Sequence, residues 1–591
     1  MAAKPLNPKP LQLKRERGRG TIRAKAFEKS VNVLIDHDLA HLDQPFSYGV
    51  PEQLMEQVRI GSKVLVPFNK EEREGVVISE FMQTPIPNKP LLKVLNSYAY
   101  QAETLELAEV VASRYATSVT KVLRSVPEAF SDICNSEISE KKKKPVRFFE
   151  YLTESSFDNL EKDLQDGQDT SLILLPTEKE AERLFSRLVV KLGDRAMKAF
   201  GRAKFPKVLP LGAIVIGTRN AIFWQIPNLA KIVVIDELSE HFWSNRNPYW
   251  NVRDVALLRS NISGVDLSFI SAFPSAEILR LVDIGYLREL RGSRRTLRRR
   301  QKITAKPDSY HRTVREGLDK GVVLVQTATK DYSALVLCKS CRSRPSCSCG
   351  YPLKLIKGKI FLCLVCGLSS ADWRCAICMS QEKILLNRGA IRIEEELGKA
   401  FPNTPIRIST GDKPLEVVPD GGIVVATPGM HPTDALYSAV VLLDGELQLN
   451  RPTLRAEERL VSQWFATVFT SREGAPVYLD LPAHHRVVNA MVNDSRVRLG
   501  HSILEERKIT HLPPWFRIIR LQGAGLGTAN DLIQREFPFA EISKMTGSSE
   551  LLIRVPVERS AEVTTALYAL VKYRAATQKD LLSISVDPFD I

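Results

Sequence analysis

Eight of the nine cysteines lie between Cys338 and Cys378, and they come in four pairs. In three of these pairs two residues separate the cysteines, a spacing that lets both thiolates of one tight turn reach the same ion. Four thiolates at about 2.3 Å complete the tetrahedral coordination of zinc, so eight of them predict two closed structural zinc sites. The stretch holds no histidine, so sulfur supplies every predicted ligand. The pairs are Cys338/Cys341, Cys347/Cys349, Cys363/Cys366 and Cys375/Cys378.

A disulfide network is the alternative interpretation of these cysteines. Disulfides persist in oxidising compartments, whereas the N-terminal residues are rich in Lys, Arg and Pro and lack the apolar core of a secretion signal. No apolar run is long enough to predict a membrane span. We therefore expect a cytoplasmic protein with reduced, metal-binding thiols and no membrane partner. Cys134 is expected to be a buried or idle thiol, and the single residue between Cys347 and Cys349 predicts different backbone geometry at that pair.

The charge of the chain favours a polyanionic partner. Lys and Arg total 83 against 68 Asp and Glu, which gives a formal net charge of +15 and a pI near 9.3. Basic proteins of this kind usually bind nucleic acid, although solubility alone is the alternative explanation. The basic residues cluster in a predicted disordered arm, in a predicted linker and in a segment that could line a phosphate track or form an exposed basic loop. These clusters are residues 1–30, Lys141–Lys144 and Arg288–Lys306, the last with Arg294, Arg295, Arg298, Arg299 and Arg300.

Hydrophobic patterning predicts a multidomain α/β protein. Short alternating segments bounded by Pro and Gly predict a small β domain, and helical spacing of apolar residues follows it. Two regions then alternate continuous apolar strands with amphipathic helices, as in parallel sheets covered on both faces. The predicted parts are a basic arm (1–30), a β domain (31–98), a winged-helix-like module (99–140), two RecA-like helicase domains (141–300; 301–337 with 379–505), a zinc-binding insertion (338–378) and a C-terminal α+β domain (506–591).

Asp236 and Glu237 follow a predicted strand directly, where a nucleotide hydrolase presents carboxylates to Mg²⁺ and water. ATP hydrolysis on such a fold also needs a phosphate loop, G-x-x-x-x-G-K-[ST]. The segment 145–170 should contain this loop, but its single glycine is Gly167. Tight binding of Mg·ATP is therefore not expected, and the two acidic residues are interpreted as structural remnants or surface carboxylates. We predict no catalytic residues.

Several segments together resemble the PriA family of bacterial replication restart helicases of superfamily 2. The N-terminal segments resemble the family's 3′-DNA-end-binding domain and winged helix, and later segments resemble its helicase motifs and C-terminus. The zinc cluster also follows the family order. The segments are His41–Tyr48, Val66–Phe68, Arg114–Ala116, Val122–Arg124, Ile216–Phe223, Arg253–Ala256, Pro452–Arg459 and Val586–Pro588.

The departures from the family concern the ATP-handling motifs. The phosphate loop is absent, and the acidic Asp-Glu-Glu-His box is replaced by Asp236–Ser239. The Ser-Ala-Thr motif is replaced by Ser271–Pro274, and the late Gly-Arg-x-Gly-Arg motif by Gln463–Phe469. Loss of a transition-state arginine costs orders of magnitude in rate, so the departures predict a helicase scaffold without a motor.

The resemblance also implies site residues. The family's zinc pattern implies nested pairing, in which the two outer pairs share one ion and the two inner pairs the other, while sequential pairing remains possible from spacing alone. In the family's DNA-end pocket an aromatic residue, an acidic residue and nearby polar groups hold a terminal nucleotide. Phe46 would be the aromatic, Ser47 stands at the acidic position, Asn69 stands where the family has glycine, and Lys93 is the candidate phosphate contact. The alternative for Phe46 is a core aromatic.

The resemblance implies a protein that binds stalled or branched replication forks and promotes primosome assembly and loading of the replicative helicase. The implied partners are forked DNA, single-stranded regions, 3′ ends, primosomal proteins, single-stranded DNA-binding protein and the replicative helicase, in a nucleoid-associated position in a bacterial cytoplasm. Two alternatives stay open. One is an active ATP-dependent 3′→5′ helicase with an unrecognised nucleotide site, and the other is a zinc-dependent primosome scaffold with little DNA affinity.

Overall fold

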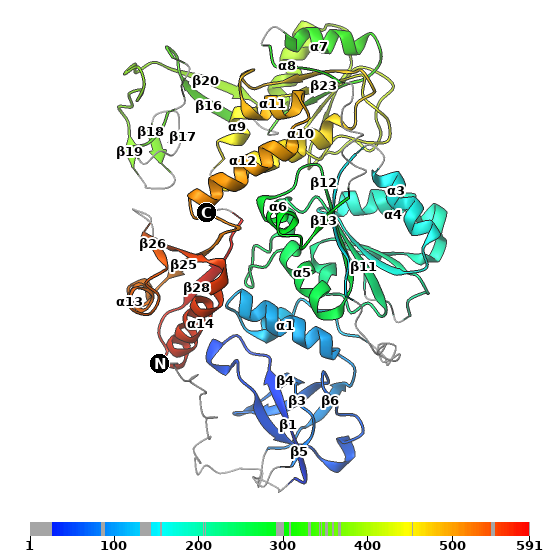
Figure 1. The fold of residues 1–591 in the computed structure, drawn as a ribbon, viewed down its shortest axis with the longest axis vertical. Coiled ribbons are helices and arrows are strands. Elements are labelled where there is room, and N and C mark those ends of the chain that lie inside the picture. Colours follow the sequence, from blue (N-terminus) through cyan, green and yellow to red (C-terminus); the bar gives the residue numbers. More distant parts are fainter. Residues whose placement is uncertain are drawn as a thin grey trace. The chain divides into compact units, whose positions relative to one another are not determined.

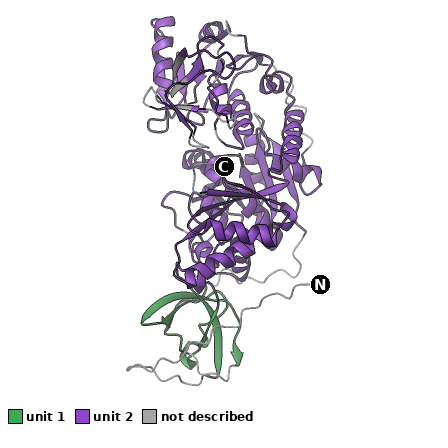
Figure 2. Ribbon diagram, turned by 90° about the vertical axis from the view of Figure 1, so that its left-hand side faces the viewer, with its two compact units in different colours: residues 1–36, 44–99 green, residues 37–43, 100–591 purple. Residues whose placement is uncertain are grey.

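The computed structural model describes residues 27–589 except 84–88, 130–143, 154–155, 205, 207, 291–300, 307–308, 329–332, 342, 344, 349–352, 357–359, 364–367, 452 and 545–549. The chain divides into two compact units, one of residues 1–36 and 44–99 and the other of residues 37–43 and 100–591 (Figure 2). Several predicted features lie outside the described residues: most of the basic arm, Cys134, Lys141–Lys143, the arginines between 294 and 300, Cys349 and Cys366.

The first unit is the predicted small β domain. Its antiparallel sheet has the order β2-β1-β4-β3-β6, with β5 paired to β1. Alternate residues of β3 point inward, so Val64 and Val66 are buried among Val31 and Val33 of β1. The strands are β1 (Lys29–Ile35), β2 (Phe46–Gly49), β3 (Lys63–Phe68), β4 (Glu71–Val77), β5 (Met82–Gln83) and β6 (Lys93–Asn96), and η2 (Glu52–Leu54) follows β2. Because β1 begins at Lys29, its first two residues fall within the predicted arm, residues 1–30.

Two helices open the second unit, α1 (Ala102–Arg114) and α2 (Val119–Leu123). The apolar residues of α1 that recur at helical spacing are buried, as the pattern predicts. The side chain of Ser118 caps α2 by accepting a hydrogen bond from the backbone N–H of Lys121. These helices lie within the predicted winged-helix-like module, whose remaining residues from 130 to 140 are not described, so that module stays a prediction. The short η1 (Ala40–Leu42) also belongs to this unit.

A seven-stranded parallel sheet, here called lobe 1, covers residues 144–290, with the order β13-β7-β12-β11-β8-β10-β9. Its central strands are continuous apolar runs that are buried throughout, as helices on both faces require. The elements are β7 (Arg147–Tyr151), α3 (Ser156–Asp166), β8 (Thr170–Leu174), α4 (Glu178–Leu192), η4 (Gly193–Arg195), β9 (Ala196–Ala199), β10 (Ile214–Gly217), η5 (Arg219–Phe223), β11 (Leu229–Ile235), η6 (Glu240–Phe242), α5 (Val252–Ser263), β12 (Asp266–Ser271), α6 (Ala276–Asp283) and β13 (Arg288–Glu289).

A second parallel sheet, lobe 2, has the order β14-β24-β23-β15-β22-β21 and lies between residues 301 and 509. Figure 1 shows α10 and α12 beside this lobe, on the side where α6 of lobe 1 lies. The elements are β14 (Lys302–Thr304), α7 (Ser309–Leu318), β15 (Val323–Gln326), α8 (Ala390–Ala400), β21 (Ile406–Ser409), β22 (Ile423–Ala426), β23 (Ala439–Leu442), α9 (Gly445–Leu449), α10 (Ala456–Val468), β24 (Pro476–Leu479), α11 (Arg486–Val492) and α12 (Arg496–Ile509). The predicted pair of parallel sheets is confirmed.

The cysteine-rich stretch is inserted into lobe 2 between β15 and α8. An antiparallel ribbon of β16 (Ser333–Cys338) and β20 (Lys383–Arg388) leads away from the lobe 2 sheet to a small sheet of β17 (Leu353–Ile356), β18 (Ile360–Cys363) and β19 (Ser369–Ser370) (Figure 1). These elements are here called the cysteine module.

The chain ends in the predicted α+β domain, an antiparallel sheet with the order β26-β27-β25-β28. Its elements are β25 (Phe516–Gly523), α13 (Leu526–Glu536), β26 (Glu541–Lys544), β27 (Glu550–Pro556), η8 (Val557–Arg559), α14 (Ser560–Ala576) and β28 (Leu582–Val586). Among the described residues, no helix has both the length and the apolar character needed to cross a membrane.

Candidate metal centre and nucleic-acid interface

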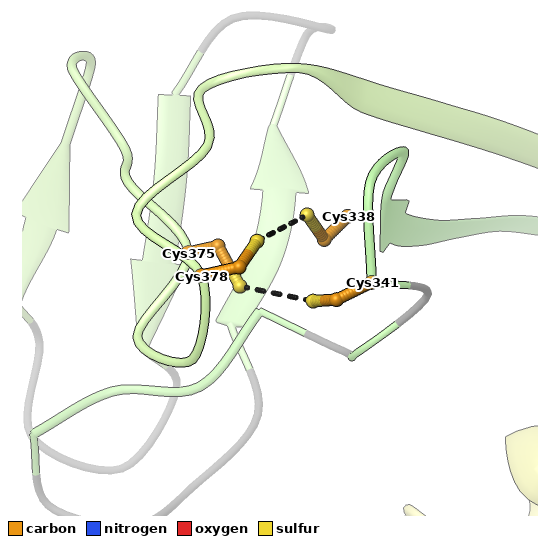
Figure 3. A group of neighbouring side chains, drawn as sticks. All are labelled: Cys338, Cys341, Cys375 and Cys378. Atoms are coloured by element: carbon orange, nitrogen blue, oxygen red, sulfur yellow. Dashed lines mark hydrogen bonds between the residues drawn. The ribbon is translucent and has the colours of Figure 1, made fainter.

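Four thiols of the cysteine module converge at one point. The sulfurs of Cys338, Cys341, Cys375 and Cys378 all lie within 4.8 Å of one another. Sγ of Cys338 is 3.4 Å from Sγ of Cys378, and Sγ of Cys341 is 3.5 Å from Sγ of Cys375 (Figure 3). Four sulfurs bound tetrahedrally to zinc at about 2.3 Å would lie about 3.8 Å apart. The four thiols therefore fit a structural zinc ion, and they are the two outer pairs.

The two turns that carry these thiols have the same local design. In each turn the backbone N–H of the first cysteine donates to the carbonyl five residues later: Cys338 to Ser343 at 2.8 Å and Cys375 to Ser380 at 2.9 Å. The Ser343 hydroxyl lies 2.9 Å from Sγ of Cys341 and 3.1 Å from Sγ of Cys375. Hydrogen bonding by Ser343 and by backbone N–H groups lowers the pKa of Cys375 to about 6, and the thiolate is the form that binds metal.

The inner pairs are described only in part. Cys347 and Cys363 are buried, and the backbone N–H of Cys363 donates to the carbonyl of Leu368 at 2.8 Å. The first cysteine of each outer turn makes a bond with the same spacing in sequence. Because Cys349 and Cys366 lie outside the described residues, the second zinc site stays a prediction.

Among its described residues, the cysteine module contains a buried cluster of five, in which the Phe361 and Trp373 ring centroids lie 5.0 Å apart. Two of the five are Cys338 and Cys375, so the cluster lies against the four converging thiols. A metal ion bound there would therefore stabilise the packing of the module. The members are Val336, Cys338, Phe361, Trp373 and Cys375.

The candidate DNA contacts all lie in the first unit. Phe46 begins β2 and packs partly against the core, and its ring centroid is 5.4 Å from that of Phe68 at the end of β3. Phe46 is therefore half-buried, which suits both the stacking role and the core-aromatic alternative. Ser47 is exposed beside it on β2, and Lys93 is exposed at the start of β6, paired with Leu65 of β3.

Asn69 lies in the tight turn between β3 and β4, directly after Phe68, and is exposed. Its φ of 55° is in the left-handed region, which glycine adopts freely and asparagine tolerates better than most residues. The replacement of the family's glycine by asparagine at this turn therefore preserves the backbone conformation. Asn69 lies near Phe46, because it directly follows Phe68, whose ring contacts that of Phe46. Lys93 lies on β6, which is the neighbour of β3 in the sheet.

The end of β2 also approaches the segment that leads into β6. The backbone N–H of Gly49 donates to the carbonyl of Lys89 at 2.8 Å, and the N–H of Leu91 donates to the carbonyl of Gly49 at 2.9 Å. Strand β2 is thus held beside the residues that precede Lys93. The small sheet therefore brings Phe46, Asn69 and Lys93 to neighbouring segments, although they are far apart in the sequence.

The acidic residues Asp236 and Glu237 of lobe 1 are bonded to other groups of the protein. Glu237 is only 1% exposed, accepts a hydrogen bond from the backbone N–H of Ser275 at 2.9 Å and lies 3.7 Å from Nη1 of Arg253. Asp236 accepts a hydrogen bond from Oγ of Ser462 at 3.2 Å. Burial raises the pKa of Asp236 to about 6 and that of Glu237 to about 7. Glu237 is therefore buried and is not a surface carboxylate, whereas its proposed lack of a catalytic role stays a prediction.

The link between β7 and α3 occupies the position of a phosphate loop. It has four residues, 152–155, fewer than the Gly-x-x-x-x-Gly span that would have to fit there. The backbone N–H of Thr153 donates to Oγ of Ser156 at 2.9 Å, and that hydroxyl donates to Oε1 of Glu150 at 3.3 Å. Thr153 is therefore bonded to the first residue of α3, and the backbone N–H of Leu152 donates to the carbonyl of Ser271 at 2.8 Å.

Sequence reasoning missed a set of buried charges on helices α5, α6, α10 and α12 and at the residue directly before α10. Arg253 and the 455–459 segment were recognised only as parts of a family resemblance, without a role. A charged residue in a helical pattern predicts an exposed position, so the pattern alone could not identify their partners. The residues are Arg253, Glu277, Arg455, Glu458 and Arg507.

Residues 32–127 match the 3′ DNA-binding domain (3′BD) of PriA. The probable replication restart protein PriA of Mycobacterium leprae is 25% identical over 650 residues, covering 93% of this chain and 99% of that protein. The replication restart protein PriA of Rickettsia felis is 25% identical over 490 residues, covering 70% of this chain and 74% of that protein. The chain is thus similar to PriA at about 25% identity over most of its length.

The match to the PriA 3′BD begins inside β1 and extends through α2, so it includes all four candidate DNA contacts. Similarity to PriA then continues across both lobes, since it spans most of the chain. Among solved structures, a DEAD box protein from Methanococcus jannaschii is 11% identical with a TM-score of 0.28, covering 61% of this chain and 86% of that one. An overlap this loose carries no argument about activity.

Proposed function

We propose that the chain is a replication restart protein of PriA type that binds stalled or branched replication forks, engages exposed 3′ ends and promotes primosome assembly and loading of the replicative helicase. The observation that carries the proposal is the match of residues 32–127 to the PriA 3′BD. Similarity to PriA over 93% of the chain supports the wider role. The net charge of +15 suits a phosphate backbone as partner.

In the proposed mechanism the first unit holds the strand end. A terminal base stacks on the accessible part of Phe46, Lys93 contacts a phosphate, and the exposed Ser47 and Asn69 supply polar contacts to the terminal sugar. Base stacking on an aromatic side chain is worth about 1–3 kcal/mol. The four outer thiols hold a zinc ion that stabilises the cysteine module, and that module offers a docking surface for protein or single-stranded DNA.

We further propose that this activity needs no ATP-driven unwinding. Glu237 is engaged by Ser275 and Arg253, and the β7–α3 link is short, with Thr153 and Leu152 bonded to Ser156 and Ser271. These contacts support a scaffold without a motor. DNA-stimulated ATP hydrolysis by a zinc-loaded preparation would favour the active-helicase alternative instead. Fork binding that depends weakly on salt would favour the scaffold alternative, because few counterions would be released.

The direct test measures binding of forks with a free or a blocked 3′ end to the full chain and to Phe46→Ala. Loss of stacking should weaken binding to the free-end fork by about 5- to 150-fold, equivalent to about 1–3 kcal/mol, with a smaller change for the blocked fork. Phe81→Ala is the matched control, since Phe81 is an exposed phenylalanine of the same unit. Equal affinity of wild type and Phe46→Ala for the free-end fork would remove the end-binding role.

A further inference from the structure

We propose that the two lobes form one rigid body, fixed by a buried seam in which α10 and α12 of lobe 2 pack against α6 and the ends of β11 and β12 of lobe 1. The seam contains the segments Asp236–Ser239 and Ser271–Pro274, which replace the family's ATP-handling motifs. This inference concerns the lobes alone and does not depend on the DNA-end binding proposed above. Its consequence is that nucleotide cannot drive the lobes apart or together.

One hydrophobic core runs through the seam. Leu238, Ala272 and Phe273 of lobe 1 belong to the same buried cluster as Leu460 and Trp464 of lobe 2. Packing there is close, because a Cβ atom placed on Gly500 would come within 2.4 Å of the Leu279 side chain. Residues 100–591 accordingly form a single compact unit. Separating the lobes would expose this shared apolar surface to water at about 25 cal/mol per Å².

Buried charges join the lobes at the centre of the seam. The Glu277 carboxylate of lobe 1 lies 2.5 Å from Nη2 of Arg455 in lobe 2, and Arg455 is 1% exposed. Arg253 of lobe 1 and Arg507 of lobe 2 approach the same carboxylate at 3.3 Å and 3.8 Å. Arg507 also pairs with Glu458. A single carboxylate is thus shared by arginines from both lobes.

Hydrogen bonds cross the seam beside these charges. The backbone N–H of Ala276, in the first turn of α6, donates to Oε1 of Glu458 at 2.9 Å. A carboxylate from lobe 2 therefore satisfies the N-terminus of a lobe 1 helix, where negative charge is favourable. Nη1 of Arg496 donates to the carbonyl of Ala272 at 2.7 Å, and Ser462 donates to Asp236.

Contacts at two further places support the seam. On α4 of lobe 1, Nζ of Lys179 donates to the carbonyl of Met430 at 3.4 Å, and Arg183 donates to the carbonyl of His431 at 3.3 Å. Near the end of the described chain, the Phe589 ring centroid lies 5.1 Å from that of Trp243 in lobe 1 and 4.8 Å from Cζ of Arg459 in lobe 2.

The chemistry of the seam resists both small and large displacements. A small rotation or shear would separate Glu277 from its arginines before water could enter, and an unpaired buried charge is strongly unfavourable. A large opening would hydrate the charges but would expose the shared core. Either movement is therefore costly, whereas lobes that close and open around ATP need an interface that can part repeatedly.

Hydrogen exchange and calorimetry on the full, zinc-loaded chain test the proposal. In wild type, amides of α6, α10 and α12 should exchange as one cooperative unit, both lobes should melt in one transition, and millimolar Mg·ATP should change neither. Glu277→Gln should speed exchange on the order of a hundredfold in all three helices, because three arginines lose a shared anion. Glu506→Gln is the control, since this carboxylate is exposed on α12 and pairs with the surface residue Arg486.

If Glu277→Gln does not fold, Ser462→Ala serves as a milder variant, which should speed exchange about fivefold in the same helices through loss of one hydrogen bond. The proposal is overturned by separate melting of the lobes, by faster exchange confined to one lobe, or by a response of the seam amides to Mg·ATP. None of these results would affect the proposed binding of DNA ends, because that proposal is tested separately by measuring fork binding.

Discussion

The cysteine module and the lobe seam both join residues that are distant in the sequence, but by opposite means. In the module the four outer thiols meet beside a buried cluster that includes Phe361 and Trp373, and Cys341 and Cys378 are exposed. In the seam the joining groups are buried charges set in an extensive apolar core. We propose that the module depends on a bound metal ion, whereas the seam uses only groups of the chain itself.

Because of this difference, we expect the cysteine module and the lobe seam to respond to different perturbations. A metal site is lost when the metal is removed or a ligand is replaced. A buried seam is insensitive to chelators, but it is sensitive to cavities and to unpaired charges. Each perturbation can therefore be applied to one region while the other serves as the internal control.

Removal of zinc should have the largest effect. A chelator should abolish amide protection in β16, β18 and β20 and leave the seam helices protected, because structural zinc contributes about 10–16 kcal/mol to zinc-finger folding. Cys375→Ser should lose one equivalent of zinc by metal analysis, whereas Cys134→Ser should lose none. Unchanged protection of the module after chelation would show that its thiols stabilise it without metal.

A cavity in the seam should come next. Phe273→Ala removes a fully buried side chain of lobe 1 from the shared core and should lower the free energy of unfolding by about 3–5 kcal/mol. Both lobes should become less stable together in calorimetry, while zinc content stays unchanged. Leu581→Ala, at a residue 79% exposed, should change stability by less than about 0.5 kcal/mol. Loss of stability in lobe 1 alone would contradict a shared core.

The smallest expected effect is a pH dependence in the seam. The raised pKa of Glu237, about 7 against an ordinary value of 4.5, means that the folded state holds a proton that the unfolded state releases. Its contribution to stability is present at low pH and is lost as pH rises through about 7. Glu237→Gln stays neutral at every pH, so its stability relative to wild type should improve between pH 5 and pH 8.

The size of that improvement should be on the order of 2–3 kcal/mol, since one pKa unit corresponds to about 1.4 kcal/mol. Urea unfolding of both proteins across this range measures it. Below pH 4 both proteins should lose stability as the pH falls. Nearby arginines lower the pKa values of Asp254 and Glu277, so protonation of these carboxylates removes their ion pairs. A constant difference between the two proteins from pH 5 to pH 8 would contradict a raised pKa at Glu237.

Much of the fold could be predicted, because its strands, helices and turns follow from patterns of neighbouring residues. The apolar runs of β8, β10 and β11 predicted a parallel sheet, and the structure contains it. The cysteine spacing predicted metal-binding turns, and the outer thiols converge. Of the DNA contacts, Phe46 could not be decided between stacking and core packing, because the exposure of an aromatic side chain depends on which strands surround it.

The sequence by itself determined the order of domains, the thiol pairs and the departures from the helicase motifs, because each depends on residues close together in the chain. Only the tertiary structure decided where the charges of α6, α10 and α12 lie. Glu277 and Arg455 look like ordinary surface residues in a helical pattern, and they are buried because helices of the two lobes pack against each other there. Long-range packing thus placed the charges that join the lobes.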